Sequence, residues 1–145
     1  IGRGYDDGIL SALEILKILD NNKNKKLNDL YNELPITFSS PTMSPKCPEE
    51  SKYDVIKKLE KIFKNKMKNK EPLAGQKILS ILTVNGVRIY LEDGSWGLVR
   101  ASSNSPNLVV VCESAVSEER MKEVFSGLNN ELIKFEEIGD YDQKI

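Results

Sequence analysis

The sequence contains no histidine, the side chain that most often acts as a general base near neutral pH. Its absence excludes Ser-His and Cys-His catalysis within these 145 residues. The two cysteines, Cys47 and Cys112, are far apart in the sequence and form no CxxC motif, so the usual ligands of a structural zinc site are also lacking. We therefore expect no metal site in this chain and no histidine-dependent chemistry.

Disulfide frameworks, long apolar runs and a surplus of one charge are missing as well. Two cysteines are too few for a disulfide framework and fit a reducing compartment, which predicts a cytoplasmic protein. No apolar run approaches the length of a membrane span, and no signal peptide is visible. The formal net charge of -1 gives no overall attraction to nucleic acid or to acidic lipid. With 39% hydrophobic residues, the chain can still bury a core.

The N-terminal segment has a helical pattern. The chain begins with Ile1 rather than Met, so we expect it to be the C-terminal part of a longer protein. Asp6 and Asp7 precede a run with helical apolar spacing, where the helix dipole favours carboxylates. A second short helical pattern follows and ends at Pro35. Two helices without a sheet make a poor core, and we interpret residues 1–34 as the helical end of a preceding domain.

Residues 35–48 contain four prolines with serines between them: Pro35, Pro41, Pro45 and Pro48. This composition is typical of an extended connection between domains, although residues 42–47 could still pair as an edge strand. We assign the following domain to residues 49–138. Residues 139–145 are expected to be a frayed tail.

Residues 49–138 combine helical and strand patterns. Apolar residues recur at helical spacing after Glu49 and Glu50, and again after Ser117, which predicts a helix at each place. Four segments between them predict strands, with hairpin turns at Asn85-Gly86 and Asp93-Gly94: residues 78–82, 87–92, 96–100 and 108–112. Short consecutive strands flanked by helices indicate the α+β class. We predict a four-stranded antiparallel sheet with helices packed on one face.

The loop between the last two predicted strands carries the most informative chemistry. Arg100 is followed by a run of small polar side chains: Ser102, Ser103, Asn104 and Ser105. A guanidinium matches two phosphate oxygens, and hydroxyl, amide and backbone N–H groups can bind the remaining ones. From composition alone, an ordinary polar hairpin loop explains the same residues.

The loop belongs to a longer pattern that resembles a known family. The runs Asn85-Gly86-Val87-Arg88 and Gly94-Ser95-Trp96-Gly97-Leu98-Val99-Arg100-Ala101-Ser102, closing on Pro106, resemble the last domain of α-D-phosphohexomutases, especially the phosphomannomutase/phosphoglucomutase branch. The opening Tyr5-Asp6-Asp7-Gly8-Ile9-Leu10-Ser11-Ala12 is similar to the helix that ends the third domain of those enzymes, and Glu50-Ser51-Lys52-Tyr53 to the first helix of the fourth. The resemblance runs in order along nearly the whole chain.

The resemblance implies a TATA-binding-protein-like fold whose Arg-x-Ser-Asn/Gly-Thr loop holds the phosphate of the bound sugar. Arg100 and Ser102 match that pattern directly. Ser103 replaces the usual Asn or Gly, and Asn104 replaces the usual Thr, but both remain capable donors. The implied phosphate-binding residues are therefore Arg100, Ser102, Ser103, Asn104 and Ser105.

The resemblance also implies an activity for the longer protein. Such enzymes interconvert hexose 1-phosphates and 6-phosphates through an active-site phosphoserine, with Mg²⁺ and a hexose 1,6-bisphosphate intermediate. The phosphoserine, magnesium and sugar-loop motifs of the family are absent from this sequence. We expect no catalytic residue and no mutase activity in this chain alone, and we expect phosphosugar and the remaining domains to be its partners. Asp6-Asp7-Gly8 is better explained by helix capping than by metal binding.

A rival hypothesis is an independent α+β binding module, for a ligand or for nucleic acid, without catalysis; a purely structural cap is another. Seven lysines between Lys57 and Lys70 could attract nucleic acid or an acidic membrane surface. However, residues 64–70 contain no aromatic platform for bases, and acids such as Glu49 and Glu60 lie nearby in the sequence. We favour a solvated helix end, and expect no nucleic-acid or membrane partner.

Overall fold

The computed structural model describes residues 7–145 and divides the chain into two units, one ending at Ile36 and the other running from Thr37 to Ile145. The first unit contains helix α1, Gly8–Asn21, and helix α2, Leu27–Asn32. Asp7 caps α1, because its carboxylate accepts a hydrogen bond from the backbone N–H of Leu10 at 2.9 Å. Asp6, the other acid expected there, lies outside the described residues.

Neither helix of the first unit buries a residue completely. Large apolar side chains remain exposed on both helices, including Ile9, Leu16 and Tyr31. Two short helices alone offer each other too little apolar surface for a core.

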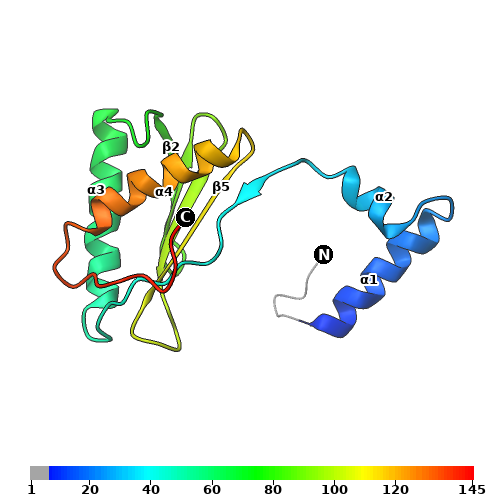
Figure 1. Cartoon of the computed structure of the whole chain (residues 1–145), viewed down its shortest axis with the longest axis horizontal. Coiled ribbons are helices and arrows are strands. Elements are labelled where there is room, and N and C mark those ends of the chain that lie inside the picture. The colour runs from blue at the N-terminus through cyan, green and yellow to red at the C-terminus, as the bar shows by residue number, and fades with distance from the viewer. Residues whose placement is uncertain (1–6) are drawn as a thin grey trace. The chain divides into compact units, whose positions relative to one another are not determined.

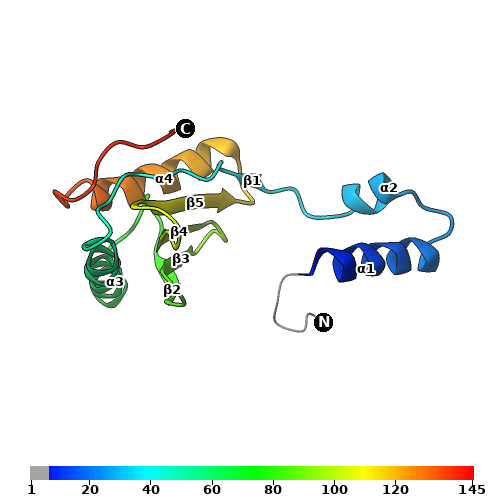
Figure 2. The ribbon, with the colours of Figure 1, turned by 90° about the horizontal axis from the view of Figure 1, so that it is seen from below.

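The second unit is an antiparallel sheet with two helices (Figures 1 and 2). Its elements follow in the order β1 Phe38–Ser39, α3 Lys52–Asn69, β2 Ile78–Leu82, β3 Val87–Leu91, β4 Trp96–Ala101, β5 Leu108–Ser114 and α4 Glu118–Leu132. The strand order is β1-β5-β4-β3-β2, and every neighbouring pair is antiparallel. The predicted α+β class is confirmed, and none of the helices in residues 7–145 is long and apolar enough to cross a membrane.

The sheet has five strands, so the prediction of four was wrong. The additional strand is β1, which pairs with the end of β5 through Phe38↔Ser114 and Ser39↔Glu113. The next residue, Ser40, also donates its backbone N–H to the carbonyl of Cys112 at 2.8 Å. Proline at position 41 has no N–H to continue the ladder, which keeps this edge strand short.

Alternation along the strands places one face of the sheet in the core. In β3, Val87, Ile89 and Leu91 are buried, whereas the residues between them are partly exposed. Helix α3 contacts β2, β3 and β4, and α4 contacts β4, β5 and β1, so the two helices together cover that face (Figure 2). Gly97 of β4 leaves the space that Leu128 of α4 fills, since a Cβ at Gly97 would overlap the Leu128 side chain.

The segments on either side of the domain also pack against it. Isolated bridges join Met43 to Val110 and Pro45 to Tyr141. The Tyr141 hydroxyl donates to Asn129 at 2.9 Å, and its ring meets Phe125 edge to face, with 5.8 Å between centroids. The tail therefore packs against the domain rather than fraying, because Tyr141 anchors it and the backbone N–H of Ser44 donates to the Asp142 carboxylate at 2.6 Å.

Candidate functional site

The Arg100 loop, residues 100–106, begins at the end of β4 and leads into β5. Arg100 pairs with Val109 in the sheet, so its backbone is fixed by the ladder before the chain turns. Its side chain alternates with Val99, which is completely buried, and therefore emerges on the face of the sheet opposite the core. The rigid strand thus presents a half-buried guanidinium at the start of the loop.

A hollow of about 450 Å³ is lined by Arg100 at the end of β4. It collects residues from α3, from the turn between β2 and β3, and from the Arg100 loop: Tyr53, Ile56, Lys57, Asn85, Gly86, Arg100, Ala101 and Ser103. Two of the five predicted site residues, Arg100 and Ser103, line the same hollow. Lys57 supplies a second cation there, and its ammonium lies 3.4 Å from Asp54.

The Arg100 side chain makes few polar contacts within residues 7–145. Among the residues that the structure describes, its guanidinium makes one hydrogen bond, from Nη1 to the carbonyl of Ala101 at 3.3 Å, and no ion pair. By contrast, Arg120 is held by Asp93 and Glu123. An arginine without an acidic partner keeps most of its five donors available.

The other predicted residues form a closed turn. The hydroxyls of Ser102 and Ser105 are 2.9 Å apart, and the backbone N–H of Asn104 points at the Ser102 hydroxyl from 3.4 Å. The turn is closed at its base because Ser102 donates its N–H to the carbonyl of Asn107 at 3.0 Å. Ser102, Asn104 and Ser105 therefore shape the loop, whereas Ser103 lies in the hollow.

Sequence analysis missed Lys52, which holds this turn from beneath. Its ammonium donates to the carbonyl of Ser102 at 2.6 Å and to that of Ser105 at 3.3 Å. In the sequence, Lys52 is distinguished only by belonging to the family-like run Glu50-Ser51-Lys52-Tyr53 at the start of the helix. A lysine in the first turn of an amphipathic helix gives no sign of burial, because the loop that covers it lies about fifty residues later in the chain.

The cysteines supply no reactive group at the site. Burial raises the pKa of the Cys112 thiol to about 12, and burial likewise raises the pKa of Cys47. Both thiols are therefore neutral near pH 7 and poor nucleophiles. No group of three or more potential metal-ligating His, Cys, Asp or Glu side chains occurs within residues 7–145.

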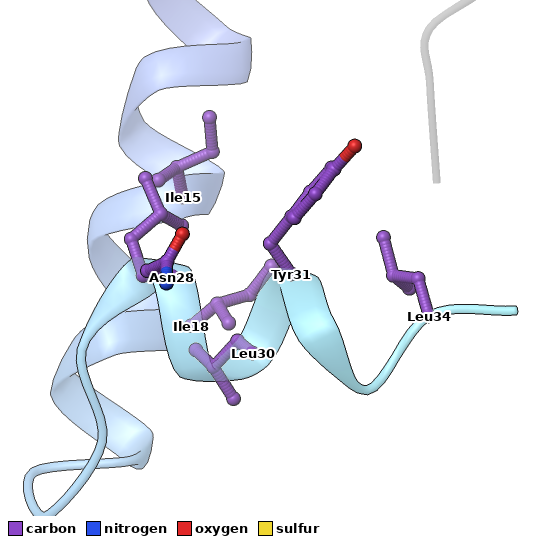
Figure 3. Close-up of a pocket in the computed structure, with 7 residues that line it drawn as sticks. Ile15, Ile18, Asn28, Leu30, Tyr31 and Leu34 are labelled. Atoms are coloured by element: carbon purple, nitrogen blue, oxygen red, sulfur yellow. The ribbon is translucent and has the colours of Figure 1, made fainter. Parts of the chain in front are cut away.

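A larger hollow, about 790 Å³, lies between α1 and α2 in the first unit (Figure 3). Figure 3 shows Ile15 and Ile18 of α1 with Leu30 and Tyr31 of α2 around it. Its lining is aliphatic apart from Asn28 and Tyr31, and it contains no charged side chain. This hollow has no cation to match the charge of a phosphate, so the larger of the two hollows is not the candidate phosphate site.

The lysines of α3 are mostly engaged by acids. Lys57, Lys58, Lys64 and Lys66 each lie within salt-bridge distance of a carboxylate. Their charges are therefore partly compensated along the helix rather than presented as one basic strip.

Comparison with known proteins places this arrangement in a family. Residues 45–130 match the family model described as phosphoglucomutase/phosphomannomutase, C-terminal domain. A phosphoglucomutase/phosphomannomutase family protein from Burkholderia thailandensis has a similar structure, with a TM-score of 0.66 over 92% of this chain and 25% of that chain, at 22% sequence identity. The chain belongs to the phosphoglucomutase/phosphomannomutase family, and the resemblance inferred from its motifs is confirmed.

Relatives whose names mention different sugars are each similar to most of this chain. The phosphomannomutase/phosphoglucomutase of Pseudomonas aeruginosa is 34% identical over 124 residues, which are 84% of this chain and 24% of the relative. The phosphopentomutase of Thermococcus kodakarensis is 33% identical over 77% of this chain and 22% of the relative. A probable phosphoglucosamine mutase of Methanothermobacter thermautotrophicus is 31% identical over 78% of this chain and 23% of the relative. The chain thus spans about a quarter of the length of the relatives it matches.

Proposed function

We propose that this domain binds the phosphate of a phosphosugar in the hollow beside Arg100, as part of a longer phosphohexomutase. The observation that carries the proposal is Arg100, which lines the hollow together with Lys57 and Ser103 and whose guanidinium has no acidic partner in the described chain. Arg100, a hydroxyl and Lys57, whose charge Asp54 partly compensates, favour an anion over a neutral ligand in this hollow.

Each side chain has a distinct part in this proposal. The planar guanidinium of Arg100 binds two phosphate oxygens, and the hydroxyl and backbone N–H of Ser103 donate to a third. Asn104 presents its amide from the exposed tip of the turn. Ser102 and Ser105, whose hydroxyls already share a hydrogen bond, can each still direct one lone pair or proton toward a bound phosphate.

The relatives' names suggest why the phosphate, rather than the sugar, is recognised here. They name a pentose, hexoses and glucosamine, and what these substrates share is a phosphorylated sugar. A loop that binds the phosphate serves all of them. In a mutase it also serves both orientations of one sugar, because either end must be held while the other reacts.

We propose that the longer protein interconverts hexose 1-phosphate and 6-phosphate by way of a phosphoserine and a hexose 1,6-bisphosphate. Residues 7–145 gather no group of three or more potential metal-ligating side chains. The proposal assigns Mg²⁺ and the phosphoserine to the remaining domains, which are the proposed partners of this one. The role of residues 7–145 is to bind and orient the phosphate and to exclude water when the domain closes.

The proposal is tested by titrating the 145-residue chain with glucose 1-phosphate while observing its amide NMR signals. We expect signals from the Arg100 loop to shift with glucose 1-phosphate and to stay in place with glucose. Arg100→Ala should weaken binding by about tenfold or more, because it removes charged hydrogen bonds. Its melting temperature should hardly change, since Arg100 makes no ion pair that supports the fold. Equal binding by both proteins would contradict the proposal.

A further inference from the structure

Lys52 is the most deeply buried charged residue of the domain, with 1% of its side chain exposed. It is the first residue of α3, where solvent would ordinarily be within reach of a long side chain. Burying an ammonium is costly unless its protons are hydrogen-bonded, so the contacts of Lys52 show what its charge is used for.

All three hydrogen-bond donors of the Lys52 ammonium have acceptors. Two are the carbonyls of Ser102 and Ser105, at 2.6 and 3.3 Å, and the third is the carboxylate of Glu49 at 2.7 Å. The two carbonyls stand at the beginning and the end of the same four-residue turn. The ammonium therefore fixes the turn at two points, from the side of α3.

The geometry of the peptide bond carries this constraint to the hollow. The described chain has no cis peptide bond, so the N–H of Ser103 points away from the Ser102 carbonyl that Lys52 binds. This N–H has no acceptor among residues 7–145, and Ser103 lines the hollow with Arg100. Holding the carbonyl inward leaves the N–H pointing outward as a donor.

We propose that Lys52 is a positioning residue for phosphate binding, which orients the Arg100 loop and adds a buried positive charge behind it. The inference rests on the proposed phosphate-binding function. The side chain of Glu49 is 62% exposed, so water screens its charge more than that of the buried Lys52 ammonium. Lys52 itself does not touch the phosphate.

The test compares variants of the 145-residue chain in titrations with inorganic phosphate and with glucose 1-phosphate, followed by amide NMR. Lys52→Met removes the donors and the charge, and should weaken both affinities by about tenfold. Lys52→Arg restores a buried cation with donors, and should recover affinity to within about threefold of wild type. Lys61→Met is the matched control: it removes an exposed lysine from the same helix, and should change affinity by less than about twofold.

A purely structural Lys52 would give a different result. In that case any loss of affinity would follow the loss of folded protein, and a fully folded Lys52→Met protein would bind phosphate as well as wild type. Wild-type affinity in a fully folded Lys52→Met protein overturns the inference and leaves the proposed phosphate site intact. If the wild-type loop signals do not respond to phosphate at all, the proposed function fails, and the inference fails with it.

The wild-type chain provides a second measurement in case Lys52→Met does not fold. A buried, hydrogen-bonded ammonium exchanges its protons slowly enough to be observed by NMR, whereas an exposed one does not. The Lys52 ammonium signal should be visible, and should shift along the same titration curve as the Ser103 amide. A Lys52 signal that stays in place while the Ser103 amide shifts would overturn the inference.

Discussion

At the residue scale, the hydrogen-bond donors of the Arg100 loop are common side chains, and the surrounding fold decides which of them line the hollow. Arg100 could be predicted as the principal candidate ligand because no other cation stands among the small polar residues of the loop. Lys52 and Lys57 could not be predicted, because α3 has many lysines and only the tertiary fold decides which of them approach the loop. For Ser103 and Asn104, sequence identifies donors, but the fold decides which of them lies in the hollow.

Gly86 allows the turn between β2 and β3 to rest directly on the backbone of Arg100. A Cβ at Gly86 would lie 2.6 Å from the Val99 carbonyl oxygen and 2.9 Å from the Arg100 Cα. Gly86→Ala should therefore displace the end of β4, destabilise the domain by about 1–3 kcal/mol and weaken phosphate binding. Chemical denaturation and the phosphate titration measure the two effects.

Gly94→Ala is the matched control for that prediction. Gly94 has a φ of 82° but nothing within 4 Å of its missing Cβ, so an alanine there costs about 1 kcal/mol of backbone strain without touching the loop. Phosphate affinity should be unchanged in Gly94→Ala. If the two variants lose affinity equally, the contact of Gly86 with Arg100 is not what matters.

Asp93 should make the stability of the domain depend on pH. Burial raises the pKa of Asp93, but hydrogen bonds from Ser95 and Arg120 outweigh burial, so the pKa lies below its usual value of 3.8. The ionised form is thus favoured in the folded state, and its stabilisation is present above the unfolded pKa and lost as the pH falls through the lowered folded pKa. Asp93→Asn should cost about 1–2 kcal/mol of unfolding free energy at pH 7, since it breaks a charged pair that is largely buried.

The measurement is urea unfolding of wild type and Asp93→Asn from pH 7 down to pH 3. The difference in unfolding free energy between wild type and Asp93→Asn should be constant above about pH 5 and should shrink below about pH 4. Glu118→Gln, which breaks the exposed pair with Lys122 on α4, should change the unfolding free energy far less than Asp93→Asn does. If the difference in unfolding free energy stays constant from pH 7 to pH 3, the charge of Asp93 is not the cause of the lost stability.

At the scale of elements, the sequence predicts whatever has a repeating pattern. Helices α3 and α4 and strands β2 to β5 were all identified from apolar periodicity and turn residues. The two-residue strand β1 was not, because Phe38 and Ser39 are too few to show alternation and stand among prolines. The anchoring of Tyr141 was missed for a related reason: a single aromatic residue near a chain end has no periodicity, and its contacts are with distant segments.

Helices α1 and α2 should be much less protected from hydrogen exchange than α3 and α4. They bury no residue completely, and Ile9 and Tyr31 are 78% and 69% exposed, whereas α3 and α4 contribute many side chains to the core. We expect amides of residues 8–32 to exchange close to the rate of an unfolded chain under conditions that protect α3 and α4. Equal protection would mean that the apolar faces of α1 and α2 are covered in solution.

At the scale of the whole molecule, the family could be recognised because its motifs are spread over separated segments in the right order. The resemblance predicted the α+β fold, and the match to the family model over residues 45–130 agrees with it. Physical patterns alone would have given the fold class and a polar loop, but no substrate. If the loop binds phosphate as proposed, it does not set the preference for one sugar, because phosphate is what the substrates named for the relatives have in common.

The last prediction is that the 145-residue chain binds phosphosugar but does not convert it. Phosphoryl transfer needs a group that accepts the phosphate and charges that stabilise the transition state. Residues 7–145 contain the proposed phosphate-binding loop, but no histidine, no cluster of potential metal ligands, and two buried thiols that are neutral near pH 7. Incubation with glucose 1-phosphate and Mg²⁺ should yield no glucose 6-phosphate in a coupled assay.

The control for this assay is the same protein sample in the glucose 1-phosphate titration, which shows that the loop is folded and occupied. Binding without turnover would assign the domain a share of substrate recognition and leave the chemistry to the remainder of a longer enzyme. Turnover that disappears in Arg100→Ala would mean instead that this chain holds a catalytic group that its sequence does not reveal. Because contaminating mutase would be insensitive to Arg100→Ala, the variant also separates true activity from an impurity.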